Sequence, residues 1–289
     1  MQITNVYHII MDINSYLWRV LGKMKLYEWN IGMAATIPCN KGYTLLPWVI
    51  DEILNEKPDC IVLTGFVVSQ GFDYYIDELN RNGYKWFVSS TTKSNGILIA
   101  LSSSSFNFNE TFDYTKYTVK TSSDVLMGNE LPDLYEIQVK WNGSPLSIIG
   151  VRIKVDITNK NAKYKQNQFM ALDDYLSKQK DDVLCIGDYN AYWGNSWSKP
   201  KNTTLNKTMK NGYSLHTPRY GVGDWYSFVQ PNGNKNQLDH LITNIKKSIT
   251  VNYDWGFLNT SRYPSNIAAD TANKPNGMPD HAIIKATII

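Results

Sequence analysis

The chain has 289 residues, and 43% of them are hydrophobic, which is enough to bury a large core in one β-rich domain. Its net charge of +3 is too small to indicate an anionic partner by itself. No apolar stretch is long enough to span a bilayer, which argues against a helical membrane protein. The three cysteines share no metal-type spacing, and we expect reduced cysteines in a cytoplasmic protein.

Hydrophobic periodicity and the positions of Gly, Pro and Asn residues predict the secondary-structure elements. Residues 1–23 lack the features of a signal peptide, and we expect an N-terminal extension, either a short helix or disordered. A single catalytic domain is expected over 24–289. In chain order, the patterns predict a strand at 25–32, a helix at 45–57, a strand at 61–66, a helix at 72–83, strands at 84–90, 96–102, 135–141 and 146–155, a helix at 163–179, and strands at 182–190, 226–229, 237–243, 250–258 and 281–288.

Helices therefore interleave with many short strands, without the regular alternation of a doubly wound parallel sheet. The pattern favours an α+β domain in which sheets pack face to face with helices outside.

Four strand ends carry polar residues that a buried strand does not need. They are Asn30 in YEWNIG, Asp188 and Asn190 in IGDYNAY, Asp239 in NQLDHLIT, and Asp280 with His281 in MPDHAII. Each alone is explained by a turn or a cap. Together, carboxylates and amides at one sheet edge form a pocket suited to Mg²⁺ or Mn²⁺, and a His beside a carboxylate can act as a general base. Phosphodiester hydrolysis requires this combination.

The order and spacing of GDYN, LDH and the terminal PDH resemble the motifs GD-[FY]-N, [IL]-D-[YH] and S-D-H of the endonuclease/exonuclease/phosphatase superfamily. This superfamily includes pancreatic-type deoxyribonuclease, abasic-site endonucleases, sphingomyelinases and inositol polyphosphate 5-phosphatases. The resemblance covers residues 24–289. It implies a four-layer α/β/β/α sandwich, with two packed mixed β-sheets flanked by helices.

The resemblance also implies roles for the matched residues. Asp188 would orient the attacking water, and Asn190 would hold a phosphate oxygen. His281 would be the base or the group that polarises the phosphate, with Asp239 as its hydrogen-bonded partner. Ser227 in YSF corresponds to a Ser or Thr that the family often carries near this cluster, and the resemblance makes it a candidate for substrate binding.

Two positions depart from the family pattern, and the first is Arg152 in GVRIKV. Many members have a His in the matching strand, whereas a guanidinium can clamp a phosphate but cannot serve as a neutral acid or base. We expect Arg152 to face inward and contact a phosphate; the alternative is an ordinary surface arginine.

The second departure concerns the metal. Asn30 and Asp280 would help to hold it, but the family's main ligand, a Glu at the end of the second strand, is Gly65 in this chain. Asp59 and Asp73 are the nearest acidic residues along the chain and are too distant to substitute. We expect the metal to be poorly held, activity to be attenuated, and a carboxylate in place of Gly65 to restore both. The alternative is ordinary divergence, with the metal held by other groups.

The stretch 192–224 interleaves basic and aromatic residues, as a nucleic-acid-binding loop does, although a solvated surface loop could have the same composition. Its substrate-binding candidates are Trp193, Lys199, Lys201 and Arg219. The sequence thus favours a monomeric, Mg²⁺- or Mn²⁺-dependent phosphodiester hydrolase, first of all a nuclease acting on DNA. The alternatives are a catalytically silent nucleic-acid-binding module of the same fold, and a phosphodiesterase or phosphatase for a small molecule or phospholipid.

Overall fold

The computed structural model describes a series of segments that together carry the sheets and helices. They are residues 22–32, 45–89, 96–106, 120–121, 131–154, 162–191, 205–230, 233–259 and 279–289. The predicted N-terminal extension lies outside them up to residue 21, as do three of the predicted substrate-binding residues, Trp193, Lys199 and Lys201.

Two six-stranded sheets form the centre of the described structure. The first has the order β13 (Ile249–Asp254), β14 (Ile283–Ile288), β1 (Met24–Asn30), β2 (Cys60–Phe66), β4 (Gly96–Ser102) and β3 (Tyr84–Val88). The second has the order β5 (Lys120–Thr121), β6 (Asp133–Trp141), β7 (Ser144–Arg152), β8 (Asp182–Asp188), β12 (Asp239–Thr243) and β9 (Ser214–His216). Both sheets are mixed, because β1–β2 and β7–β8 are parallel pairs and their other pairs are antiparallel.

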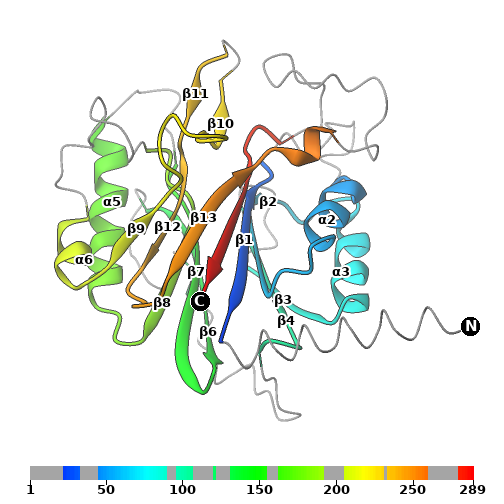
Figure 1. Cartoon of the computed structure of the whole chain (residues 1–289), viewed down its shortest axis with the longest axis horizontal. Coiled ribbons are helices and arrows are strands. Elements are labelled where there is room, and N and C mark those ends of the chain that lie inside the picture. The colour runs from blue at the N-terminus through cyan, green and yellow to red at the C-terminus, as the bar shows by residue number, and fades with distance from the viewer. Residues whose placement is uncertain are drawn as a thin grey trace, which may run out of the picture.

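Helices cover the outer face of each sheet (Figure 1). The first sheet carries α2 (Pro47–Leu54) and α3 (Phe72–Arg81), and the second carries α5 (Ala162–Ser177) and α6 (Asn206–Lys210). A short hairpin of β10 (Phe228–Val229) and β11 (Lys235–Asn236) and a 3-10 turn, η2 (Gly256–Asn259), lie after β9 and β13 respectively. The layers confirm the predicted α/β/β/α sandwich. None of the helices in the described segments is long and apolar enough to cross a membrane.

Apolar side chains fill the space between the two sheets. Val62 and Leu98 of the first sheet belong to the same buried cluster as Ile148 and Ile186 of the second. A second cluster, which includes Leu172 of α5, packs the outer face of the second sheet. Burial on this scale is the main source of stability in such a domain.

The predicted elements are confirmed in type, and their ends differ from the predicted ones by a few residues in either direction. The helix predicted over 45–57 is limited to α2, and the strand predicted over 250–258 divides into β13 and η2. The described part of the polar stretch 192–224 contains two further elements, α6 and β9. These short elements lack the hydrophobic periodicity on which a sequence-based assignment depends.

Gly187 of β8 pairs with Val151 of β7, and its position requires a glycine. Its φ is +154°, and an added Cβ would lie 1.9 Å from the carbonyl oxygen of Val151. No side chain can occupy that space unless the two strands separate.

We therefore expect Gly187→Ala to lower the free energy of unfolding by roughly 3 kcal/mol or more, because a backbone clash cannot be relieved by a rotamer change. Urea denaturation measures the effect. The control is Gly143→Ala, at another positive-φ glycine with no atom within 4 Å of the added Cβ, where a loss of about 1 kcal/mol is expected. Equal losses at the two positions would contradict the clash.

Candidate functional site

The site lies where the ends of strands from both sheets meet. Asn30 ends β1, and His281 precedes β14, which pairs with β1 in the first sheet. In the second sheet, Asp188 ends β8 directly opposite Asp239, the first residue of β12. The sheet register therefore brings together residues that are up to 251 positions apart in the sequence.

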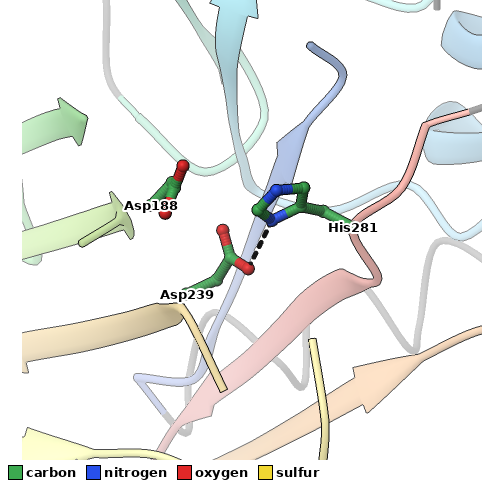
Figure 2. A group of neighbouring side chains, drawn as sticks. All are labelled: Asp188, Asp239 and His281. Carbon is green, nitrogen blue, oxygen red and sulfur yellow. Dashed lines mark hydrogen bonds and ion pairs between the residues drawn. The ribbon is translucent and has the colours of Figure 1, made fainter. Parts of the chain in front are cut away.

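Asp188, Asp239 and His281 form a tight, buried group. Their ligand atoms all lie within 4.8 Å of one another. Figure 2 shows the carboxylate of Asp239 directed at the His281 ring, with the Asp188 carboxylate beside it. The Nδ1 of His281 lies 2.7 Å from Oδ2 of Asp239, which fixes the orientation of the ring and leaves Nε2 facing the other side of the site.

Asn30 connects this group across the two sheets. Its side-chain amide donates a hydrogen bond to Oδ2 of Asp188 (2.9 Å) and lies 3.4 Å from Nε2 of His281. Its carbonyl oxygen accepts a hydrogen bond from the backbone N–H of Gly32 (3.0 Å). The side chain is 3% exposed, so its orientation is held by these partners rather than by water.

The turn after β8 holds Asp188 from the other side. The backbone N–H and the side-chain amide of Asn190 each donate a 2.8 Å hydrogen bond to the Asp188 carboxylate. Asn190 has a φ of +49°, a conformation that asparagine tolerates better than most residues. Lys165 of α5 donates to the Asn190 carbonyl, and burial lowers the pKa of this lysine. No motif in the sequence indicated this contact.

Ser227 holds the start of β12. Its hydroxyl oxygen accepts hydrogen bonds from the backbone N–H groups of Leu238 (2.8 Å) and Asp239 (3.1 Å). Its carbonyl oxygen accepts from the N–H of Ala282 (2.8 Å), next to His281. Within the described segments, Ser227 thus aligns the two halves of the Asp239–His281 pair; a substrate-binding role stays a prediction.

Burial and neighbouring charges shift the pKa values of the group. Burial raises the pKa of Asp188 to about 6, with a further contribution from the Asp239 carboxylate. Burial opposes the charged form of His281, but the Asp239 carboxylate beside Nδ1 outweighs it, with help from Asp188, and the pKa is raised. His281 is therefore favoured as an imidazolium ion, which can polarise a phosphate oxygen.

The other predicted site residues surround this group less closely. Arg152 lies opposite Asp188 in the register of β7 and β8, and its charge lowers the pKa of that carboxyl. Its guanidinium is 3.7 Å from Asp133, and its buried Nε has no hydrogen-bond partner in the described part of the chain. Asp280 is half-buried, and Arg219 is exposed on the loop after β9. Their predicted roles in metal and substrate binding stay predictions.

Gly65 lies in a bulge of β2. The register with β4 shifts between Leu63 and Phe66, and Gly65 has a φ of +64°. An added Cβ would lie 2.7 Å from Oδ1 of Asn30 and 2.8 Å from the backbone nitrogen of Gly32. This geometry argues against the expectation that a carboxylate at Gly65 restores a ligand, because a side chain there is strained and collides with backbone; the expectation stays a prediction.

Glu28 in β1 contributes a buried carboxylate that the sequence motifs did not indicate. This side chain is 0% exposed, and its Oε1 accepts a hydrogen bond from the hydroxyl of Thr64 (2.8 Å). Its position two residues before Asn30, on the same face of the strand, was the available signal. Charged residues at inward strand positions are rare unless they are paired or functional.

The donor set fits a hard divalent cation. Carboxylate oxygens of Asp188 and Asp239 converge beside the His281 ring, and two buried carboxylate oxygens, Oδ1 of Asp239 and Oε2 of Glu28, have no hydrogen-bond partner in the described segments. Buried polar atoms without partners are uncommon and call for an occupant such as an ion or water. Asp188, Asp239 and Asn30 are suited to Mg²⁺ or Mn²⁺ by ligand type.

The chain matches no protein-family model and no curated protein. Its structure is similar to truncated TDP2 from Caenorhabditis elegans, at 15% identity and a TM-score of 0.62, over 92% of this chain and 97% of that one. It is similar to the 3'-5' exonuclease NExo from Neisseria meningitidis (17%, TM-score 0.57, 91% and 98%) and to beta toxin from Staphylococcus aureus (15%, TM-score 0.55, 91% and 99%). The chain therefore has the fold of the endonuclease/exonuclease/phosphatase superfamily, as the motifs predicted.

Gly65→Glu is expected to lower the free energy of unfolding by about 2 kcal/mol or more and to leave Mn²⁺ affinity no higher than in the unsubstituted protein, because the bulge must deform to accept the side chain. Denaturant unfolding and calorimetric Mn²⁺ titration provide the two measurements. Gly65→Ala, with the same strain but no carboxylate, is the control. A stable Gly65→Glu protein with tighter Mn²⁺ binding would contradict the structure.

An NMR titration of the histidines is expected to give different pKa values for two buried rings, those of His281 and His240. His281 should titrate above the ordinary histidine value, while burial lowers the pKa of His240 to about 4. Asp239→Asn should move the pKa of His281 downward, because it removes the neighbouring negative charge. In the parent protein, the stability from His281 is complete below its unfolded-state pKa and is lost as pH rises through its raised folded-state value. An unchanged His281 titration in Asp239→Asn would exclude the coupling.

Proposed function

We propose that the chain is a divalent-metal-dependent phosphodiester hydrolase, with nucleic acid, and DNA first, as its substrate. The observation that carries the proposal is the convergence of Asp188, Asp239 and His281 within 4.8 Å. Three strand ends supply them, and Asn30 links Asp188 to the imidazole side of the group. A base or electrophile, its orienting carboxylate and a second carboxylate are the groups that hydrolysis of a phosphate ester uses.

Asp188, Asp239 and Asn30 would hold the metal. When bound, the ion would act as a Lewis acid that stabilises negative charge on the phosphate. The chain's own residues would divide the remaining tasks. Asp188, held by Asn190, would orient the water for attack, and His281, held by Asp239, would hold a proton at Nε2 beside a non-bridging phosphate oxygen.

Arg152 lies across the strand pair from Asp188 and is suited to stabilise negative charge that develops on the phosphate. Its unpaired Nε is buried at the end of β7. A guanidinium so placed would bind a phosphate oxygen but would not donate a proton to the leaving group, because its pKa is far above neutrality. Protonation of the leaving group would then fall to His281 or to water.

A row of aromatic rings beside the site supports a nucleic-acid substrate. Tyr220 packs on Trp225 with ring centroids 4.2 Å apart, and Tyr226 continues the row 5.8 Å from Trp225. Lys235 lies over the Tyr226 ring at 4.1 Å. The row connects to the site through the segment of Ser227, which bonds to Asp239. Tyr220 is exposed, and Trp225 and Tyr226 are partly buried. Accessible rings next to cations suit stacking of bases and contact with phosphates.

Two of the solved structures with this fold carry nucleic acid. One is D. rerio TDP2 complexed with single strand DNA product, and the other is NExo from Neisseria bound to a product DNA hairpin. Such likeness supports a nucleic-acid substrate as the first class to test, although one fold serves many substrates.

A catalytically silent nucleic-acid-binding module is the second candidate, and Gly65 favours it, because the second strand brings no carboxylate to the site. That candidate predicts binding that weakens with salt and is independent of metal. A phospholipid or small-molecule phosphodiesterase or phosphatase remains the third candidate.

Incubation with Mg²⁺ or Mn²⁺ and a panel of plasmid, single-stranded DNA, RNA, abasic DNA, sphingomyelin and inositol phosphates tests the proposal. We expect cleavage of a nucleic acid, abolished by EDTA and reduced at least about 100-fold in His281→Ala. The matched control is His216→Ala, which changes a half-buried histidine on β9 and should retain activity. Nucleic-acid binding without turnover would select the silent module, and turnover of lipid or inositol phosphate alone would select the third candidate.

A further inference from the structure

Glu28 faces the interior between the two sheets. Successive side chains of a strand point to opposite faces, so Glu28 shares a face with Asn30, whereas Trp29 packs against Trp48 of α2 on the other. Both Glu28 and Asn30 are almost completely buried. The carboxylate therefore lies in the layer from which Asn30 enters the candidate site.

The carboxylate of Glu28 extends toward the catalytic edge. In the β1–β2 register, Glu28 is opposite Val62, and Asn30 is opposite Thr64. Yet Oε1 of Glu28 accepts its hydrogen bond from Thr64, two pairs further along (2.8 Å). The side chain thus reaches the level of Asn30 and contacts the residue directly before Gly65.

The other carboxylate oxygen of Glu28 is unsatisfied. Oε2 is buried and has no hydrogen-bond partner among the residues that the structure describes, and the same is true of Oδ1 of Asp239. A cation bound between these two carboxylates would satisfy both oxygens.

We propose that Glu28 is the metal-binding carboxylate of this protein, supplied from β1 in place of the one that β2 lacks at Gly65. Glu28 lies outside the group of ligand atoms within 4.8 Å, so it would join that group by a side-chain rotation when the ion binds. The inference rests on the proposed function, because it concerns the same divalent cation. It implies a site that keeps a full set of carboxylates but draws them from different strands.

Mn²⁺ titration by calorimetry, with the thermal midpoint followed in parallel, tests this assignment. Glu28→Gln should weaken Mn²⁺ binding at least about 10-fold and reduce the rise in midpoint that Mn²⁺ produces. Glu136→Gln is the matched control. Glu136 is also fully buried, but it bonds to Tyr175 of α5 on the outer side of the second sheet, and its replacement should leave Mn²⁺ affinity within about threefold.

Glu28→Asp is a second variant that keeps the assignment testable if Glu28→Gln does not fold. It keeps the charge but withdraws the oxygens by one methylene group, so it should also weaken Mn²⁺ binding; circular dichroism without metal checks that each variant is folded. Mn²⁺ affinity equal to that of the unsubstituted protein in a folded Glu28→Gln or Glu28→Asp variant would overturn the assignment. So would the absence of Mn²⁺ binding by the unsubstituted protein.

The two proposals fail in different ways. Nucleic-acid cleavage together with unchanged Mn²⁺ affinity in Glu28→Gln would overturn the role of Glu28 and leave the hydrolase standing. Mn²⁺ binding that depends on Glu28, without cleavage of any substrate, would overturn the hydrolase and leave the metal site.

Discussion

The hydrogen bond from the Asn30 amide to Asp188 is the interaction on which the site depends. It joins the end of β1 to the end of β8, and hence one sheet to the other, at the edge where the polar side chains gather. Both partners are buried, so the low local dielectric strengthens the bond and makes its loss costly. Because Asn190 also holds Asp188, the carboxylate has a fixed direction before any substrate arrives, which is the condition for electrostatic preorganisation.

Much of the fold could be predicted because its longer elements carry clear periodicity. The apolar strand that became β2 and the amphipathic helix that became α5 were recognisable from local pattern. The pairing order was not, because β1 lies between β2 and β14, the last strand of the chain. Short elements such as β9 were missed, since three residues cannot show a period. The face-to-face packing of the sheets with helices outside was predicted from the elements, and the motif resemblance added the four-layer α/β/β/α order.

The motif residues of the site could be found because each follows a buried strand, and the register then places them together. The sequence could not reveal which residues of the parallel strands β1 and β2 lie side by side. From the sequence, the only evident candidates to replace the carboxylate missing at Gly65 were Asp59 and Asp73, the nearest acidic residues along the chain. Glu28 is more remote in sequence but bonds to Thr64, directly before Gly65. The bulge could not be predicted either, because a glycine in the sequence does not reveal whether its φ is positive or negative.

The bulge at Gly65 lies so close to Gly32 that an added Cβ at Gly65 would be 2.8 Å from the Gly32 backbone. A larger residue at position 65 therefore requires both segments to shift together, which a single substitution does not accomplish. With Glu28 as the proposed ligand, redesign of ion preference would begin at β1 rather than at β2. A sequence search that demands an acid in the second strand would discard a chain that carries it in the first.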